Sequence, residues 1–431
     1  MGIFISYFTP LIGHIIPNYN YFRINPCLMA HRKLYDDLLA HMPKKEFSII
    51  TGARQTGKST LLHQLEESCL RGGIPTVFLN LENKTVLAEI NDHPLNVLKF
   101  VPDIKKRTVI FVDEIQYLDD PSNFIKLLFD EHSEQLKIIA SGSSAFYMDD
   151  RFKDSLAGRK KIFQLLTCSF DEYLDLSGKS SLKSEKSRLL QQIGSKSTQL
   201  DYLRIEWENY MIYGGYPAVI TEADNQEKIS RLKEIRDSFV KRDVLESGVL
   251  NETAFFHLFR ILAAQTGNLI NVSEFSSTLR IKNETVLNYL NVLKKCFHIA
   301  FVKPFYRNLR KELVKMPKVF LLDTGMRNCL LDNFQLPSIR TDRGELWENV
   351  VFLSLLAKYS LDDIRYWRTS AGNEVDFIVQ GNNDTRAIEA KYDKNRLNPL
   401  KYKIFKEAYP NIPIEYVWMY PFDDDFFRRL H

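Results

Sequence analysis

One stretch of the sequence has the residue types and spacing of a phosphate-binding loop. Its residues are Gly52, Ala53, Arg54, Gln55, Thr56, Gly57, Lys58 and Ser59. This order matches the P-loop pattern in full, with both required glycines followed by lysine and serine. Glycines let the backbone N–H groups turn toward phosphate oxygens. We therefore expect Lys58 to contact the β- and γ-phosphates of a nucleotide and Ser59 to bind Mg²⁺.

The residues on either side of this loop predict the elements that hold it. Residues 47–50 are expected to form a buried strand, and residues 60–65 the start of a helix with an apolar stripe. The positive end of that helix dipole would point at the phosphates. Thr60 completes the expected nucleotide-binding set, and ATP and Mg²⁺ are the expected cofactors. A chance match to the pattern is the alternative.

A P-loop also needs acidic groups opposite the serine, and a second apolar run supplies them. Residues 108–112 predict a buried strand that leads into Asp113 and Glu114. We expect Asp113 to bind the metal and Glu114 to activate the attacking water, with a solvated strand end as the alternative. Ser141 ends the next strand and is expected to orient the water or the γ-phosphate, unless it only feeds the following turn. Arg159 is the candidate for stabilising transition-state charge, in this subunit or a neighbour.

A second group of charged residues occurs in the C-terminal quarter of the chain. On two predicted neighbouring strands, the alternation of side chains puts Glu389 and Lys391 on one face and lets Asp376 approach them. Together with Glu348 on a preceding helix, these carboxylates would bind Mg²⁺, and Lys391 would orient or activate a water attacking a phosphodiester. Glu-x-Lys is a common sequence, so the alternative is a domain with the nuclease fold that binds nucleic acid or has a regulatory role without cutting DNA.

Length and composition set the wider limits. A chain of 431 residues is too long for one ordinary core, so two or three domains are expected. Its hydrophobic content of 45% and charged content of 26% are typical of a soluble globular protein. Lys and Arg total 58 against 54 Asp and Glu, so any nucleic-acid-binding surface must be local. The five cysteines have no metal-ligand spacing, which favours reduced thiols in a cytoplasmic protein.

The first 28 residues are interpreted as an N-terminal extension. Residues 1–17 are apolar, but they lack the basic start and the cleavage site of a signal peptide and are too short to span a bilayer. No other stretch reaches transmembrane length. The sequence therefore predicts no membrane partner.

The order of elements predicts the domains that follow. Strands alternate with helices in residues 29–170, which favours a doubly wound α/β domain with a P-loop. Residues 171–250 are expected to be helical, with residues 177–198 as a flexible insertion because they are rich in Ser, Lys and Glu. Residues 336–431 are expected to form a smaller α/β domain.

Residues 251–335 contain the parts of a winged helix-turn-helix. Three predicted helices precede two strands, and Asn283 is expected to cap the third helix. The connection between the strands carries Arg307, Arg310, Lys311 and Lys315, which would contact the phosphates of DNA. A helical spacer followed by a hairpin is the alternative.

Motifs along most of the chain also support a family resemblance. In order they are GARQTGKST, VDEIQYLDD, IIASGSSAF, SLAGRKKIF, YMIYGGYPAVI, FVKRDV, LLAAQTGNLINVSEFSSTL, FLLDTGMRNCLL, GELWENVVFLSLL and YWRTSAGNEVDFIV. Together they resemble prokaryotic AAA ATPases that carry a C-terminal nuclease-like domain of unknown function. The resemblance runs from about residue 29 to near the end of the chain.

The resemblance implies roles for particular residues. Lys58 and Ser59 would be Walker A residues, Asp113 and Glu114 Walker B residues, Ser141 a sensor, and Arg159 an arginine finger. The C-terminal domain is similar to the PD-(D/E)xK fold of restriction endonucleases, although Val375 stands where that motif has proline. The family implies ATP binding and hydrolysis.

Two functions follow from these patterns. The first is an AAA-type ATPase that acts on DNA through its winged-helix and nuclease-like domains. The second is an ATP-controlled switch, of the signalling or toxin-antitoxin kind, whose C-terminal module binds protein partners without cutting DNA. An arginine finger that acts on a neighbouring subunit would require a homo-oligomer.

Overall fold

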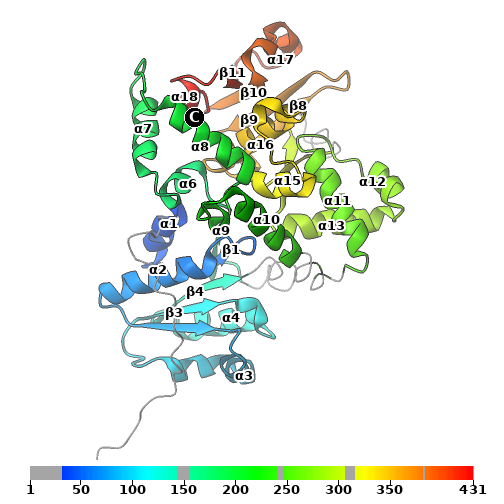
Figure 1. Cartoon of the computed structure of the whole chain (residues 1–431). Helices are drawn as coiled ribbons and strands as arrows, with labels where there is room; N and C mark the ends of the chain where they lie inside the picture. The colour runs from blue at the N-terminus through cyan, green and yellow to red at the C-terminus, as the bar shows by residue number, and fades with distance from the viewer. Residues whose placement is uncertain are drawn as a thin grey trace, which may run out of the picture.

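The structure is a computed structural model of the chain. It describes residues 32–142, 156–239, 244, 247, 249–305, 316–381 and 384–430. Figure 1 shows one sheet at the N-terminal end of the molecule, a second sheet at the C-terminal end, and helices between them. Two predictions fall outside the described residues. They are the N-terminal extension and the basic group of Arg307, Arg310, Lys311 and Lys315.

Within the described residues, the N-terminal sheet has five parallel strands in the order β2-β3-β4-β1-β5. Ile49 and Ile110 pack in a core with α4, whereas Ile50 and Phe111 pack in a second core with α2. Burial on both faces explains the apolar strands, and the predicted doubly wound α/β fold is confirmed. The elements are α1 Lys33–His41, β1 Phe47–Thr51, α2 Lys58–Arg71, β2 Thr76–Asn80, α3 Lys84–Asp92, η2 Pro94–Phe100, β3 Thr108–Asp113, η3 Ile115–Tyr117, α4 Pro121–His132, β4 Leu136–Gly142 and β5 Lys160–Gln164.

A helical region follows this sheet, and it corrects one prediction. The segment expected to be a flexible insertion contains the helix α7, whose Leu182 and Leu189 are buried in the core that includes Trp207. These two buried leucines pack the helix against the core. The sequence does not predict the helix because its many Ser and Lys residues hide so short an apolar stripe. The helices are α6 Phe170–Leu176, α7 Ser180–Gln191, α8 Leu200–Tyr213, α9 Pro217–Ile220 and α10 Asn225–Phe239.

The three helices expected in a winged helix-turn-helix are present in the middle of the chain. The third begins at Asn283 itself, so Asn283 is not its cap, and Lys282 at the capping position makes no side-chain bond to the helix. The elements are α11 Glu252–Ala264, α12 Val272–Leu279, α13 Asn283–Lys295, β6 Ile299–Pro304, β7 Lys318–Leu321 and α15 Thr324–Leu331.

The two strands expected to form the wing belong to the C-terminal sheet. Its strand order among the described residues is β11-β10-β9-β8-β6-β7, so β6 and β7 belong to the same sheet as the C-terminal strands. The parallel pairing of β6 with β8 joins them, and the domain boundary expected after residue 335 therefore cuts through one sheet. The remaining elements are η6 Pro337–Ile339, α16 Arg343–Leu356, η7 Leu361–Asp363, β8 Ile364–Arg368, β9 Glu374–Gln380, β10 Thr385–Asp393, η8 Lys394–Arg396, η9 Pro399–Tyr402, α17 Lys403–Ala408, β11 Ile414–Tyr420 and α18 Phe426–Leu430.

Candidate functional site

The phosphate-binding loop connects the end of β1 to the start of α2. A Cβ atom on Gly52 would lie 2.0 Å from the carbonyl oxygen of Leu165, so the close approach of β5 requires glycine there. Gly57 has a φ of 94° and is the residue from which α2 starts. The backbone therefore requires glycine at Gly52 and favours it at Gly57, whether or not a ligand is bound.

Lys58 is buried in this loop and held by its carbonyl groups. Its Nζ donates to the carbonyl oxygens of Gly52 at 3.0 Å and Ala53 at 2.9 Å. The Thr56 hydroxyl also donates to Ala53, at 2.9 Å. With these bonds the loop surrounds the ammonium group of Lys58. The positive charge therefore lies where a phosphate would bind.

The other residues of the predicted nucleotide-binding set lie in the loop and in the first turn of α2. Ser59 is half-buried and Thr60 is exposed, both in the first turn of α2. Arg54 is half-buried, and Gln55 is exposed with a left-handed φ of 60°. Neither short polar side chain of the first helical turn is buried, so both are accessible to a ligand at the loop.

The two acidic residues and Ser141 meet at the same edge of the sheet as the loop. Ser141 pairs in register with Ile50 of β1, and its hydroxyl donates to the Asp113 carboxylate from the neighbouring strand β4. The Glu114 N–H donates to Ser141 Oγ at 3.0 Å. Parallel strands bring their carboxyl ends to one edge, which is why residues far apart in sequence converge.

Glu114 has an unusual backbone. Its φ of 61° and ψ of 50° lie in the left-handed region, which costs a residue of this kind about 1–3 kcal/mol. Its carboxylate accepts a hydrogen bond from the Gln116 amide. A strained turn directly after the acidic strand fixes where the carboxylate points, as a water-activating group requires.

Arg159 does not join this group within the chain. Its carbonyl oxygen accepts from Phe47 N at 2.9 Å, so Arg159 lies beside the first residue of β1, whereas the loop follows the last. A five-residue strand separates the two edges by roughly 13 Å. The guanidinium instead pairs with Asp130 of α4, at 2.7 Å from Nε to Oδ1. Arg159 and the P-loop thus lie at opposite ends of β1, and a role for Arg159 at a nucleotide, in this subunit or in a neighbour, stays a prediction.

A cavity of about 610 Å³ adjoins the first turn of α2. Its walls come from α2, α6, α9 and α10, and they include Gly57, Tyr173, Pro217 and Lys228. This volume falls within the roughly 300–1,000 Å³ of small-molecule sites. The loop and the cavity together form one continuous candidate site, with a phosphate-binding end and a largely apolar end.

Arg32 is a functional residue that the sequence patterns missed. It is buried, and its guanidinium donates to Thr56 O at 2.8 Å, Leu166 O at 2.7 Å and Glu172 Oε1 at 2.9 Å. It therefore ties the phosphate-binding loop to α6 and to the segment after β5. No sequence signal could reveal this role, because its partners lie up to 140 residues away.

The second candidate group lies on β9 and β10 of the C-terminal sheet. Lys391 Nζ is 3.4 Å from Asp376 Oδ2 and also pairs with Glu389 on its own strand. The N–H of Ala390 donates to Asp376 Oδ2 at 2.9 Å. The structure thus brings together the three residues that the strand pattern selected, Asp376, Glu389 and Lys391.

Glu348 joins the group through a residue that the sequence did not single out. Lys318 of β7 is 1% exposed, and its Nζ lies 2.9 Å from Glu348 Oε1 and 2.5 Å from Glu374 Oε1. Burial raises the pKa of Glu348 to about 8, with the charges of Asp376 and Glu374 adding and Lys318 opposing. Among the residues that the structure describes, no group of three or more His, Cys, Asp or Glu side chains is arranged to hold a metal ion.

The fold and the site together define a P-loop ATPase. Residues 44–174 match the family described as AAA domain. Residues 204–336 and 343–428 match two domains of unknown function, DUF8612 and DUF4143. In the described part of the chain, every helix is too short or too polar to serve as a membrane span.

Full-length relatives are themselves uncharacterized. The protein MJ1544 of Methanocaldococcus jannaschii is 24% identical over 404 residues, which cover 91% of this chain and 86% of the relative. A Haemophilus influenzae protein is 25% identical over 378 residues, covering 85% and 87%.

Solved structures also show a limited likeness to the chain. The Aeropyrum pernix ORC1 protein in complex with DNA has a TM-score of 0.32 and 13% identity, covering 71% of this chain and 94% of its own. DnaA from Aquifex aeolicus bound to AMPPCP has a TM-score of 0.27 and 14% identity, covering 61% and 87%.

Proposed function

We propose that this protein binds ATP with Mg²⁺ at the P-loop, hydrolyses it, and uses the cycle to act on DNA through its C-terminal half. The convergence of β1, β3 and β4 supports the ATPase chemistry most strongly. Lys58 would bind the β- and γ-phosphates, and Ser59 and Asp113 would hold the metal. Glu114 would activate the water, with Ser141 fixing the backbone that carries it.

The adjoining cavity gives the nucleoside a place to bind. Leu61 and Ile220 supply apolar surface in its walls, and Gln64 supplies hydrogen-bonding groups. Lys179 and Lys228 stand at the same cavity, where they would face the ribose or the α-phosphate. Arg32 also lines this cavity, and it would position the loop through its hydrogen bond to Thr56 O.

Arg159 fits this proposal only in an assembly. Arg159 lies at the end of β1 opposite the P-loop and pairs with Asp130, so it would serve as an arginine finger for a neighbouring copy. A homo-oligomer is therefore part of the proposal.

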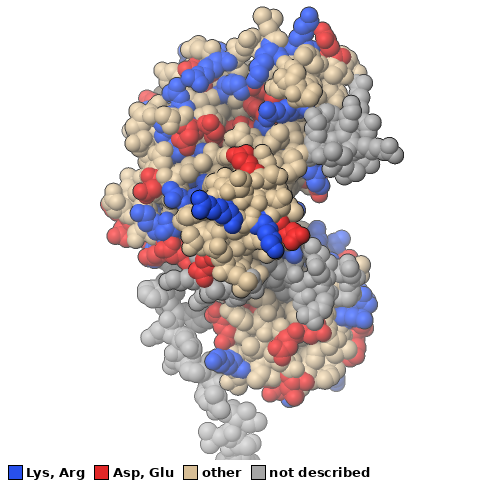
Figure 2. All heavy atoms as spheres, turned by 90° about the vertical axis from the view of Figure 1, so that its right-hand side faces the viewer, with Lys and Arg blue, Asp and Glu red and all other residues tan. Residues whose placement is uncertain are grey.

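Exposed basic residues support the DNA part of the proposal. Figure 2 shows blue Lys and Arg side chains on the end of the molecule formed by the C-terminal sheet and α17. Residues 394–408 in that region carry five exposed basic side chains and one acidic one, Glu407. The five are Lys394, Arg396, Lys401, Lys403 and Lys406. They follow β10, the strand that carries Glu389 and Lys391, and Tyr402 in the same segment is hydrogen-bonded to Glu389. DNA phosphates bound here would therefore pass close to the carboxylate group.

Replacing Lys394, Arg396 and Lys401 by Gln is expected to weaken duplex DNA binding and to lower its salt dependence. Each lost phosphate contact should reduce the slope of log K against log salt by about 1. The measurement is fluorescence anisotropy with labelled DNA between about 50 and 200 mM salt. Lys84→Gln, at an exposed lysine on the N-terminal domain, is the matched control. An unchanged affinity and slope in the triple variant would remove the support for DNA contact at this surface.

We expect the C-terminal group to bind DNA without cutting it. Lys318 and Lys391 already neutralise carboxylates that a catalytic metal would need. Labelled duplex, single-stranded and branched DNA should therefore stay intact with Mg²⁺ or Mn²⁺. Cleavage that disappears in both Asp376→Ala and Lys391→Ala would show instead that the group is a nuclease site.

The same neutralised group also favours the second function, an ATP-controlled switch whose C-terminal module binds protein partners. The two functions differ in the salt experiment. A protein-binding module gives no steep salt dependence with DNA, whereas a DNA-binding module does.

A further inference from the structure

A second cavity of about 400 Å³ lies between the ATPase end of the chain and the C-terminal helices. Its walls come from α1, α6, α7 and α8 on one side and from α16 and α18 on the other. Four lysines line it, namely Lys33, Lys183, Lys186 and Lys358. It shares no lining residue with the cavity beside the P-loop. We refer to it as the lysine cavity.

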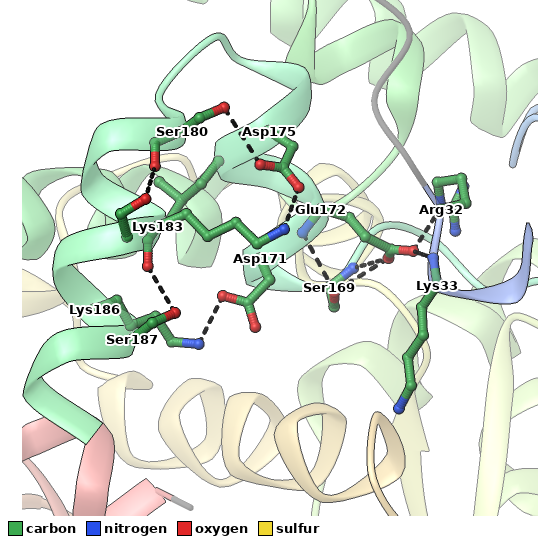
Figure 3. A network of polar contacts seen from close by, with 12 residues as sticks. Arg32, Lys33, Ser169, Asp171, Glu172, Asp175, Ser180, Lys183, Lys186 and Ser187 are labelled. Carbon is green, nitrogen blue, oxygen red and sulfur yellow. Dashed lines mark hydrogen bonds and ion pairs between the residues drawn. The ribbon is translucent and has the colours of Figure 1, made fainter. Parts of the chain in front are cut away.

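Two of these lysines have carboxylate partners. Lys186 Nζ lies 2.7 Å from Asp171 Oδ1, and Lys183 pairs with Asp175. Figure 3 shows both pairs on α6 and α7, with Lys33 reaching toward the helix on the opposite side of the gap.

The other two lysines have only main-chain partners in the described part of the chain. Lys33 Nζ donates to Ala357 O at 3.3 Å, and Lys358 Nζ donates to Leu430 O at 3.2 Å. One acid of the wall, Glu172, is already engaged, because its Oε1 accepts from Arg32 and from the backbone N–H of Lys33. Among the described residues, neither ammonium group therefore has a carboxylate within ion-pair distance.

The pKa of Lys358 reflects the excess of positive charge around this cavity. Its pKa is lowered to about 8, first by burial and then by the positive charges of Lys186, Arg386 and Lys33, while Asp171 opposes the shift. Like charges held around a cavity repel one another, and an anion bound between them would remove that repulsion. Asp36 of α1 is the third acid of the wall beside Asp171 and Glu172, so four lysines face three carboxylates at this cavity.

Aromatic residues form the rest of the wall. Phe170, Trp207, Tyr210 and Phe427 line the cavity, and the buried Nε1 of Trp207 has no hydrogen-bond partner among the described residues. Aromatic faces bind flat apolar groups, and an indole N–H is a hydrogen-bond donor. Lysines at one part of the wall and rings at another fit a molecule that has an anionic end and a ring.

We propose that the lysine cavity binds a small phosphorylated ligand of about mononucleotide size, at a site separate from the P-loop. Lys33 and Lys358 contact the phosphate from the two sides of the cavity, and Lys186 adds a third positive charge. The ligand lies next to Arg32, the arginine that holds the P-loop at Thr56 O. Binding here thus contacts both the segment that anchors the loop and the C-terminal helices α16 and α18.

The test uses the full chain carrying Lys58→Ala, which removes phosphate binding at the P-loop and makes the readout independent of ATPase activity. Calorimetric titrations with inorganic pyrophosphate and with AMP are expected to show one saturable site. Adding Lys33→Gln or Lys358→Gln should weaken binding about tenfold or more, because each removes a charged contact. Adding Lys84→Gln, on the far side of the molecule's N-terminal sheet, should leave the affinity unchanged.

Lys33 is exposed on α1, so Lys33→Gln should fold normally and its thermal unfolding curve should match that of the Lys58→Ala parent. The absence of saturable binding of both probes to Lys58→Ala would overturn the proposal. Binding that neither lysine substitution weakens would overturn it too, since the site would then lie elsewhere. A pyrophosphate site without AMP binding would support the phosphate contacts and rule out the ring-binding part.

Discussion

A Glu114→Gln variant is expected to bind ATP as tightly as the wild-type protein and to hydrolyse it at least about 100-fold more slowly. A glutamine keeps the shape of the side chain but cannot accept a proton from water, and general-base catalysis contributes about 10²–10⁴ to such rates. The backbone of Glu114 is held by Ser141 Oγ at 3.0 Å, so the substitution should leave the acidic strand in place. Binding is measured by calorimetry with ATP and Mg²⁺, and turnover by phosphate release under saturating ATP.

Two further variants make this result specific. Lys58→Ala should lose ATP binding at the P-loop itself, because the ammonium group is the loop's own positive charge. Glu134→Gln changes an exposed glutamate that pairs with Lys45 near the other edge of the same sheet, and it should hydrolyse ATP at the wild-type rate. Wild-type turnover in Glu114→Gln would show that another group activates the water and would withdraw this role from Glu114.

The phosphate-binding end of the site could be predicted because its signals are local. The loop from Gly52 to Ser59 is contiguous, and the acidic strand carries Asp113 at the end of an unbroken apolar run. The α/β alternation predicts that Ser141 ends a parallel strand at the same edge, and the observed strand order places β4, which carries it, between β1 and β3. These residues needed no tertiary information beyond the class of sheet.

Arg159 shows where local signals stop. Its distance from the P-loop depends on which end of β1 lies beside the start of β5. No periodic pattern in the sequence encodes that pairing. The start of β5 beside Phe47 decides it. The same limit applies to the expected wing, because β6 and β7 form a hairpin in either fold and only their pairing with β8 assigns them to the C-terminal sheet.

Arg32 and Lys318 could not be predicted for a related reason. Each is a single basic residue whose partners come from distant segments, with Glu172 140 positions from Arg32 and Glu348 30 positions from Lys318. A buried cation is recognisable only once the carboxylates and carbonyls around it are known. Sequence patterns therefore found the acids of the C-terminal group but not the lysine that neutralises them.

Replacing Lys318 by Gln is expected to lower the free energy of unfolding by about 3–5 kcal/mol at pH 8, because it removes the cation from a buried group of carboxylates. Lys318 is 1% exposed and pairs with both Glu348 and Glu374, and Asp376 lies near enough to act on its charge. Urea denaturation followed by circular dichroism measures the loss. Lys303→Gln, at a lysine that is 59% exposed and pairs with Asp362 on the surface, should change stability by less than about 1 kcal/mol.

The pH dependence of this loss follows from Glu348. Its pKa in the folded protein is raised to about 8 from its ordinary value of 4.5, so the folded state binds this proton more tightly than the unfolded state does. The stability contributed by that proton is complete below pH 4.5 and is lost as the pH rises through 8. Without the opposing charge of Lys318, the pKa of Glu348 rises further, so protonation relieves more of the repulsion in the variant. The deficit of Lys318→Gln relative to wild type should therefore shrink between pH 8 and pH 5. A deficit that is absent at pH 8, or that grows on acidification, would mean that Lys318 does not neutralise this group and that its carboxylates remain available to a metal ion.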